Sequence, residues 1–223
     1  MSSGPRVPII EATSIARSFI KEIEDICNKI AIVGSIRRGK QDIGDIDILT
    51  IPKSKSLLDK KIEELADNVI SGIGASWQVI FIYKGIKLNI LKTTLDSWGS
   101  SLLHSTGSKE FNTKLRSRAK SQGMLLNQYG LFNGDLYLAG SSEEDIFRIL
   151  KLEFIEPRSR NDDINIGDAE TKIYKIASSS GNSYYTVKIS DQSESCTCPH
   201  HVYRGAFCKH LKEAKLRYDK EKT

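Results

Sequence analysis

The chain has 223 residues, of which 39% are hydrophobic and 27% charged, so it has enough apolar material for a core and is not a disordered chain. No apolar run approaches 18 residues and the N-terminus has no apolar signal segment, which predicts a protein that neither spans a membrane nor is secreted. The formal net charge of +5 permits a nucleic-acid partner without requiring one. Three of the four cysteines fall within residues 196–208, a grouping that indicates a metal site in a reducing, intracellular compartment.

The first half of the chain alternates helical and strand patterns. Apolar residues recur at spacings of three and four between Ile15 and Ile30, which predicts an amphipathic helix. Residues 45–51 alternate with period two, so this strand places its carboxylates on one face and its isoleucines on the other. In chain order we expect a helix over 11–30, strands from 31 and from 45, a helix over 57–70 with a capping box of Ser56 and Asp59, and a hairpin of strands 77–83 and 86–92. This order predicts an α/β lobe.

The second half of the chain is mixed and basic. We expect a helix over 109–120 ended by Gly123, a hairpin within 124–138 that turns at Asn133-Gly134, a helix over 146–152 introduced by Ser142, a polar linker over 157–170, a strand over 184–189 and a basic helix at the C-terminus.

A Gly-Ser turn and two carboxylates suggest phosphoryl chemistry in the first half. Gly34-Ser35 precedes Gly44-Asp-Ile-Asp47 by nine residues. An isolated Asp-x-Asp pair is most often a solvated strand edge, but Asp45 and Asp47 point the same way and are close enough to share divalent cations. The turn offers N–H groups and a hydroxyl to a triphosphate, and Arg37-Arg38 would offset its charge. Two-metal phosphoryl transfer needs these parts.

The same residues carry a family resemblance. Gly34-Ser-Ile-Arg-Arg-Gly39 with Gly44-Asp-Ile-Asp47 resembles the palm motif of family X DNA polymerases, the DNA polymerase beta type. Further similarity follows in chain order, in Ser105-Thr-Gly-Ser-Lys-Glu-Phe-Asn112 with Leu115-Arg116, in Asn127-Gln-Tyr-Gly-Leu131, and in Glu143-Glu-Asp-Ile-Phe147 through Glu156-Pro157. Because only about 30 residues precede the palm, the chain resembles the minimal viral members of the family, which consist of palm and thumb alone.

This resemblance implies an α+β fold: a nucleotidyltransferase palm with a mixed sheet and helices, a small α+β thumb, and a small C-terminal metal-binding module. The expected boundaries are 1–100 for the palm, 101–158 for the thumb, 159–170 for a linker and 171–223 for the module. The implied reaction adds dNMP to a primer 3′-hydroxyl during gap filling in DNA repair. The implied partners are gapped or primer-template DNA and dNTP, without a membrane, for a monomer in the cytoplasm, the nucleus or a viral replication site.

The resemblance also implies residue roles. Asp45 and Asp47 would hold two Mg²⁺ ions, with Mn²⁺ as an alternative. Ser35, Arg38 and the Gly44 amide would hold the β- and γ-phosphates. Gly107 and Ser108, joined in the family by a cis peptide bond, would lie under the sugar and base together with His104 and Ser105. Asn112 would reach the minor-groove edge of the incoming base and Arg116 the template strand. DNA phosphates would contact the thumb helix, at Lys114, Arg116, Arg118 and Lys120, and the C-terminal helix.

Two positions depart from the family pattern. The third metal-binding carboxylate should lie on strand 86–91, where this chain has Asn89, and no carboxylate lies between Lys84 and Leu95. The aromatic pair before Thr-Gly-Ser, which helps to exclude the ribose 2′-hydroxyl, is His104-Ser105 here. His104 is as readily a stacking or surface histidine without a catalytic role. Asn89 removes an anionic ligand, so slow or absent catalysis is expected.

A second constellation lies near the C-terminus. Cys196-Thr-Cys198 and Cys208-Lys-His210 are separated by nine residues and form a Cys-x-Cys…Cys-x-His pattern. Four thiolate and imidazole ligands predict a closed, structural Zn²⁺ site. The pattern resembles the SWIM zinc finger, although His200 and His201 could compete with His210. A module of this size has little core, so the metal should supply much of its folding free energy.

Three functions remain open at this point. The chain is a gap-filling DNA polymerase, or a DNA- and nucleotide-binding protein with impaired catalysis, natural or engineered, or a template-independent or RNA-directed nucleotidyltransferase. The thumb motifs disfavour the third, because they belong to polymerases that grip a duplex.

Overall fold

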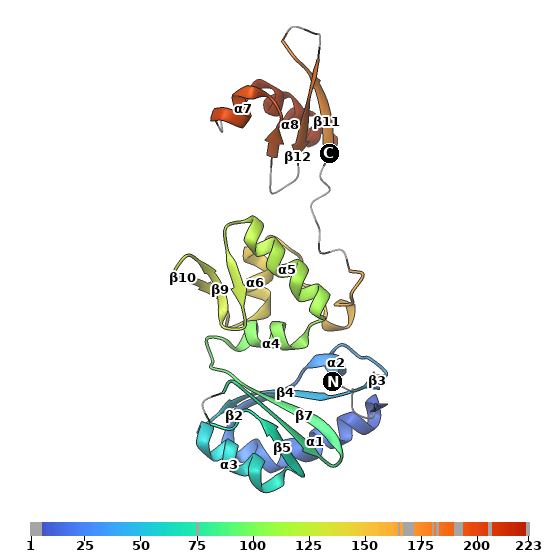
Figure 1. Ribbon diagram of the computed structural model, residues 1–223, viewed down its shortest axis with the longest axis vertical. Coiled ribbons are helices and arrows are strands. Elements are labelled where there is room, and N and C mark those ends of the chain that lie inside the picture. Colours follow the sequence, from blue (N-terminus) through green and yellow to red (C-terminus); the bar gives the residue numbers. More distant parts are fainter. Residues whose placement is uncertain are drawn as a thin grey trace. The chain divides into compact units, whose positions relative to one another are not determined.

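The computed structural model describes residues 6–74, 76–164, 166, 172–179, 181, 183–189, 194–204 and 207–221. These residues form two compact units, Met1–Ile166 and Gly167–Thr223, each described here by itself (Figure 1).

The first unit contains a five-stranded mixed sheet with the strand order β2-β4-β7-β6-β5. The strands are β2 (Cys27–Ile32), β4 (Ile46–Pro52), β5 (Asn68–Ser71), β6 (Gln78–Tyr83) and β7 (Ile86–Lys92). Only β4 and β7 pair in parallel, and the other neighbours in this sheet are antiparallel. The mixed sheet and the hairpin between β6 and β7 confirm the sequence-based expectation. The strands β1 (Val7–Pro8) and β3 (Asp42–Ile43) form a separate two-stranded antiparallel sheet.

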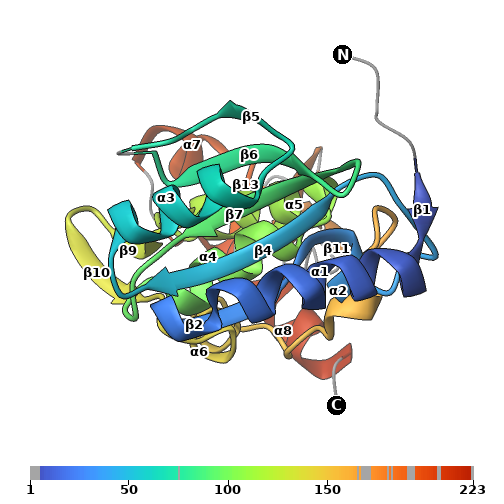
Figure 2. The ribbon, with the colours of Figure 1, turned by 90° about the horizontal axis from the view of Figure 1, so that it is seen from below.

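Helices α1 (Ile9–Ile23) and α3 (Lys55–Leu65) cover one face of this sheet (Figure 2). The period-two alternation of β4 directs Ile46 and Ile48 into the core under these helices. Phe19 of α1 packs against Phe81 of β6, with ring centroids 5.3 Å apart. Complete burial of such a side chain contributes roughly 1.5–3 kcal/mol. The opposite face of β4 is therefore left for Asp47 and for contacts with the second half of the unit.

Both predicted helices of the first half are shorter than expected. The helix predicted over 11–30 ends at Ile23, is followed by a 3-10 turn (Glu24–Ile26), and gives way to β2 at Cys27. The helix predicted over 57–70 is α3, and its last predicted residues form β5. The predicted capping box is wrong: Ser54 is the N-cap and accepts a hydrogen bond from the Leu57 N–H at 3.3 Å. Sheet pairing outweighs helical spacing at the end of each helix: β2 pairs with β4 and buries Cys27, and β5 pairs with β6 and partly buries Val69.

The rest of the first unit packs on α5 (Lys109–Ser121). Around it lie α4 (Trp98–Thr106), α6 (Glu143–Ile149), the 3-10 turn η2 (Pro157–Ser159) and a three-stranded sheet of β8 (Leu125–Asn127), β9 (Gly130–Asn133) and β10 (Leu136–Ala139). The short helix α2 (Gly34–Arg37) contacts β4 and α4. Gly123 follows α5 with a φ of +75°, and the Ser142 side chain caps α6 by accepting from the Asp145 N–H, as the sequence predicted. The hairpin predicted over 124–138 is one of two successive hairpins.

The predicted linker begins too early. Arg160 is fully buried in the first unit, and Ile166 belongs to the same apolar core. The stretch has a polar composition, but a buried arginine holds it against the protein, so composition alone misplaced its start.

The second unit is a three-stranded antiparallel sheet backed by one helix. Its elements are β11 (Lys172–Ala177), β12 (Tyr184–Ile189), β13 (Glu194–Cys196), α7 (Pro199–Arg204) and α8 (Lys209–Glu221). Strand β12 has the predicted bounds, and α8 is the basic helix predicted near the C-terminus. Leu211, Ala214 and Tyr218 of α8 pack on Ile176, Val187 and Ile189 of the sheet.

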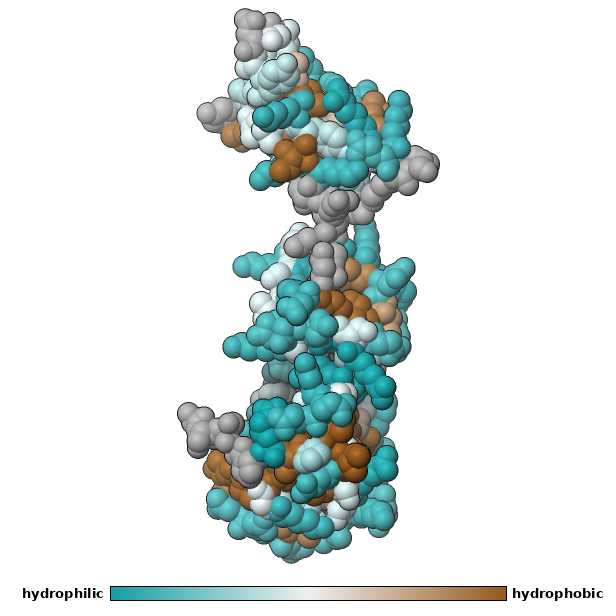
Figure 3. Space-filling view, turned by 90° about the vertical axis from the view of Figure 1, so that its right-hand side faces the viewer, coloured by the Kyte–Doolittle hydropathy of each residue, from teal (hydrophilic) through white to brown (hydrophobic). Residues whose placement is uncertain are grey.

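Hydrophilic residues cover most of the face drawn in Figure 3, and the apolar residues on it form separate patches. Within the described residues, no helix is both long enough and apolar enough to cross a membrane.

Candidate active site

The strand order brings the three predicted catalytic positions together. Asp45 and Asp47 lie at the start of β4, and Asp47 is the register partner of Asn89 on the parallel strand β7. The Asn89 amide donates to Asp47 Oδ1 at 2.7 Å and to Asp45 Oδ2 at 3.4 Å. Residues 42 positions apart in the sequence therefore form one polar cluster.

Lys87 is a member of this cluster that the sequence reasoning missed. It lies two residues before Asn89 on β7 and so faces the same side of the sheet. Its ammonium nitrogen is 3.0 Å from Asp45 Oδ2. The period-two rule that placed Asp45 and Asp47 on one face would have found it if applied to β7.

The cluster is electrostatically strained without a cation. Burial and, to a smaller extent, the Asp45 carboxylate raise the pKa of Asp47 to about 6, although Asn89, Lys87 and Arg38 act against the increase. A carboxyl whose ionised form is this unfavourable favours an added positive charge. The geometry thus suits a cation-binding site.

Gly34 allows the turn before α2 to approach this carboxylate. A Cβ atom at position 34 would lie 2.1 Å from Asp47 Oδ2, and the residue has a φ of +61°. The Val33 N–H also donates to the Asp47 carbonyl at 2.8 Å. Only glycine fits here, because any side chain would collide with the carboxylate and resist the backbone angle.

The turn places two polar groups that have no partner among the described residues. Ser35 Oγ and Arg38 Nε are buried without a hydrogen bond. Leaving such a donor unpaired costs about 1–3 kcal/mol. Arg38 also donates through Nη1 to the Thr106 carbonyl at the end of α4. Gly44, the third predicted phosphate ligand, directly precedes Asp45.

The peptide bond between Gly107 and Ser108 is cis, as the resemblance implied. Ser108 is the N-cap of α5 and accepts from the Phe111 N–H at 3.3 Å. A Cβ atom at Gly107 would lie 3.0 Å from Arg38 Nη1. The backbone just before α5 is therefore packed directly against Arg38.

His104, Asn112 and Arg116 line one small pocket between α4, α5 and β8, together with Ser100, Leu103, Leu126 and Asn127. Asn112 Nδ2 donates to the His104 carbonyl at 2.7 Å, and Arg116 Nε donates to the Asn112 carbonyl at 3.2 Å. Burial, with a smaller contribution from Arg116, lowers the pKa of His104, so the ring is neutral at pH 7. The structure thus groups these three predicted residues. Ser105 turns away, and its hydroxyl donates to the Ser101 carbonyl at 2.5 Å.

Trp77, Glu143 and Arg160 were not predicted at this site, and Arg37, which was predicted to offset phosphate charge, is paired with Glu143 instead. The ring of Trp77, just before β6, lies edge-on to His104 with centroids 6.0 Å apart. Arg37 of α2 donates to Glu143 of α6 at 2.6 and 3.0 Å, and Arg160 donates to the same carboxylate at 2.6 Å. Although burial opposes ionisation of Glu143, these hydrogen bonds hold its pKa below the usual value. Glu143 therefore connects the α2 turn to the second half of the unit.

The predicted DNA-contacting residues do not share one environment. Lys120 is exposed on α5, whereas the Lys114 ammonium donates to the carbonyls of Asp162 and Ile164, each at 2.9 Å. Arg118 is buried, and its guanidinium donates to the Leu150 carbonyl at the end of α6. Arg118 is a structural residue here, so a phosphate contact is not supported for it.

The cluster fits a divalent cation at one position better than at two. Asp45 and Asp47 offer carboxylate oxygens, the ligand type that Mg²⁺ prefers. Asn89 contributes no charge, and Lys87 already neutralises part of Asp45. The observed donors therefore fit one metal held by the two aspartates and leave a second without its third anionic ligand.

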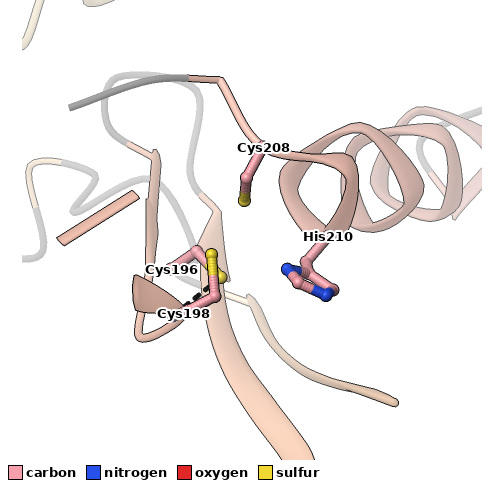
Figure 4. A group of neighbouring side chains, drawn as sticks. All are labelled: Cys196, Cys198, Cys208 and His210. Atoms are coloured by element: carbon pink, nitrogen blue, oxygen red, sulfur yellow. Dashed lines mark hydrogen bonds between the residues drawn. The ribbon is translucent and has the colours of Figure 1, made fainter. Parts of the chain in front are cut away.

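The Cys/His cluster of the second unit is assembled as predicted. Cys196 ends β13, Cys198 follows it in a turn, Cys208 precedes α8, and His210 lies in its first turn (Figure 4). Their ligand atoms lie within 4.8 Å of one another, and all four residues are buried. Both ring nitrogens of His210 lack a partner among the described residues. Three buried thiols and an unpaired imidazole suit a tetrahedral metal ion. Neither His200 nor His201 belongs to the cluster.

Two family models match this chain, the DNA polymerase beta palm at residues 6–86 and the DNA polymerase beta thumb at residues 101–161. DNA-directed DNA/RNA polymerase mu of Homo sapiens is 34% identical over 94 residues, which cover 41% of this chain and 19% of that protein. DNA polymerase lambda of Rattus norvegicus is 28% identical over 159 residues, which cover 57% of this chain and 28% of that protein. DNA polymerase IV of Saccharomyces cerevisiae is 41% identical over 66 residues, which cover 30% of this chain and 11% of that protein. The chain thus spans less than a third of the length of each of these relatives.

A solved structure shares the fold. The ternary P/T complex of Leishmania infantum polymerase beta superposes with a TM-score of 0.63 at 21% identity, over 71% of this chain and 78% of that one. The matched segments lie in the unit that carries Asp45, Asp47, the Gly34 turn and the α5 helix. The first unit of the chain therefore contains a palm and a thumb of the DNA polymerase beta type.

Proposed function

We propose that this chain is a DNA polymerase that adds dNMP to a primer 3′-hydroxyl on gapped or primer-template DNA. The observation that carries the proposal is the convergence of Asp45, Asp47 and Asn89 beside the Gly34 turn. The similarity to polymerases mu and lambda over the same residues supports it.

In this function the palm residues would bind the metal and the triphosphate. Asp45 and Asp47 hold Mg²⁺, or Mn²⁺ in its place, and the metal when bound neutralises the phosphate charge that develops during transfer. Ser35, Arg38 and the Gly44 N–H bind the β- and γ-phosphates, which gives Ser35 Oγ and Arg38 Nε the acceptors they lack. The fixed position of Arg38 against Thr106 orients these donors before the substrate arrives.

The thumb supplies the nucleoside and DNA contacts. Gly107, Ser108 and His104 border the sugar, and Asn112 faces the base, whereas Ser105 is left out because its hydroxyl donates to the Ser101 carbonyl of its own helix. Arg116 contacts the template strand, and Lys114 and Lys120 contact DNA phosphates. His104, whose pKa is lowered, contacts Trp77 edge-on and presents an uncharged ring to the nucleotide. Arg118 is left out of this set because it is buried.

A second candidate function is binding of DNA and dNTP without efficient catalysis. It is favoured by one observation, that Asn89 and Lys87 stand where a third anionic ligand is needed. In this function the Asp45–Asp47 pair still retains the nucleotide-side metal, but no base takes the proton from the primer hydroxyl.

The rate of single-nucleotide insertion on a one-nucleotide gap, measured with Mg²⁺ and separately with Mn²⁺, distinguishes the two candidate functions. We expect slow insertion by the chain with Asn89 and an increase of at least about a hundredfold for Asn89→Asp, because one preorganised electrostatic group is typically worth on the order of 10²–10³ in rate. The dNTP affinity should change little. Asp47→Asn is the matched control and should abolish insertion in both backgrounds. Ordinary insertion rates that Asn89→Asp leaves unchanged would mean that two carboxylates suffice.

We assign the second unit to a SWIM-type zinc module in which Cys196, Cys198, Cys208 and His210 hold one structural Zn²⁺. The closed set of four buried ligands supports this assignment. An intracellular monomer fits three reduced thiols and a primer-template substrate.

A further inference from the structure

One face of the sheet in the second unit carries cations without counter-charges. Strands alternate, so α8 covers Ile176, Val187 and Ile189 while the next residues along each strand face outward. The outward set, from β11, β12 and β13, is Ile173, Lys175, Ala177, Tyr184, Thr186, Lys188 and Ser195. This set, called the outer sheet face, contains two lysines and no carboxylate.

The two lysines of the outer sheet face are neighbours. Lys175 is the register partner of Thr186, so Lys188 and Tyr184, two residues to either side of Thr186 on β12, are its diagonal neighbours. Diagonal pairs lie about 7–8 Å apart. Among the described residues neither ammonium has an ion-pair partner. Like charges at that distance repel by roughly 0.5 kcal/mol in water. This arrangement does not help the sheet to form, but it would stabilise a bound polyanion.

The cations of α8 are interleaved with carboxylates. Arg217 pairs with Glu213 on the same helix at 2.7 Å, and Lys215 pairs with Glu194 of β13 at 3.4 Å. The helix also carries Asp219 and Glu221, and Glu221 pairs with Lys172 of β11 at 2.5 Å. The outer sheet face, in contrast, has no carboxylate among its own residues to offset its two lysines.

The exposed ring of Tyr184 indicates which class of polyanion the outer sheet face would bind. It is 68% exposed at one end of the face, and Ile173 is 61% exposed at the other. An exposed aromatic ring beside lysines is the arrangement on which unpaired bases stack while the ammonium groups contact the phosphates. A duplex presents its phosphates but not the faces of its bases, so it would leave the ring unused.

We propose that the outer sheet face binds single-stranded nucleic acid, with Lys175 and Lys188 on the backbone and Tyr184 against a base. This inference rests on the proposed polymerase function, in which the unpaired template strand would be the occupant. It assigns the contact to the sheet rather than to the C-terminal helix.

The test measures binding of the full chain to a fluorescent oligo-dT strand across a range of salt concentrations. Lys175→Glu with Lys188→Glu should weaken binding at least tenfold and reduce the salt slope by about 1.4, two phosphates at roughly 0.7 each. Tyr184→Ser should weaken it at least fivefold, and Tyr184→Phe should not. The matched control, Lys212→Glu with Lys215→Glu on α8, makes the same change in net charge and should weaken binding less than threefold. Retained metal content and circular dichroism show that each variant is folded.

Each outcome bears on the proposal. Equal losses from the sheet and helix variants would overturn it, because net charge alone would then explain binding. Unchanged oligo-dT binding by the sheet variants would also overturn it and leave the face to a protein partner. Insertion at a one-nucleotide gap in a duplex, measured in the Asn89→Asp background, should be the same with and without the sheet substitutions. No insertion by Asn89→Asp, with oligo-dT binding intact, would therefore refute the polymerase proposal alone.

Discussion

Asp47 meets opposing demands at the scale of single residues. Its carboxylate must ionise to hold a cation, yet burial and Asp45 raise its pKa to about 6. A position optimised for stability would carry a neutral residue, so the charge is retained at a cost that a bound cation removes.

This conflict predicts a dependence of stability on pH in the absence of divalent ions. The folded pKa of about 6 exceeds the usual value of 3.8, so the folded state binds more protons than the unfolded chain between these values. Stability therefore falls as the pH rises from about 4 to 6, and the lost part, on the order of 1–3 kcal/mol, stays lost above 6. Urea unfolding of the chain and of Asp47→Asn in EDTA should agree near pH 4 and diverge by pH 7, with the variant more stable. A difference that does not vary with pH would contradict this account.

Gly34 gives a second prediction at this scale. Gly34→Ala would place a methyl group 2.1 Å from Asp47 Oδ2, so either the α2 turn or the carboxylate must move. We expect insertion to fall at least a hundredfold and dNTP binding to weaken, measured by single-turnover insertion. Gly85→Ala is the control, since its φ of +77° is equally strained but its Cβ would meet no atom within 4 Å. Equal losses in both variants would show that backbone strain, not the contact, is responsible.

At the scale of elements, Glu143 joins three segments that are distant in the sequence. It accepts from Arg37 of α2 and from Arg160 beyond η2, and Arg160 lies over the rings of Phe111, Phe147 and Phe154. The network thus fixes the start of the palm motif to the packed centre of the thumb.

Breaking this network should destabilise the first unit. Glu143→Gln leaves two arginines without an anion, one of them fully buried, and should cost about 3–5 kcal/mol in the free energy of unfolding. Arg148→Ala removes an exposed ion pair with Asp145 on the same helix and should cost less than about 1 kcal/mol. Denaturant unfolding of both variants measures the difference. A cost below 1 kcal/mol for Glu143→Gln would show that the buried charges are balanced in another way.

What the sequence could predict at this scale depended on how local the determinants are. Turn and cap chemistry at Gly123 and Ser142 and the strand signal of residues 184–189 are short-range, and they were predicted correctly. The boundary at Cys27, the buried position of Arg118 and the role of Glu143 depend on partners far along the chain, and they were not. The same holds in the site: Asp45 and Asp47 were found from their spacing, whereas Lys87 and Trp77 contribute only through strand pairing and packing.

At the scale of the whole molecule, the two units rest on different sources of stability. The first has large apolar cores around Phe19 and Phe111. The second has one small core whose buried members include Cys196, Cys198 and Cys208. Loss of a metal should therefore affect the units unequally.

Metal removal should unfold the second unit and leave the first intact. Structural Zn²⁺ contributes apparent binding free energies of about 10–16 kcal/mol in small modules, far more than this core supplies alone. A zinc-selective chelator, or Cys208→Ser, should abolish the amide dispersion of residues 172–221 in NMR spectra, reduce bound zinc below half an equivalent, and leave the melting temperature of the first unit within about 2 °C. Cys27→Ala is the control, because this cysteine is buried in the first unit, apart from the cluster, and should leave the zinc content at one equivalent. A folded second unit in the chelated protein would show that its core suffices without metal, and the four ligands would then need another explanation.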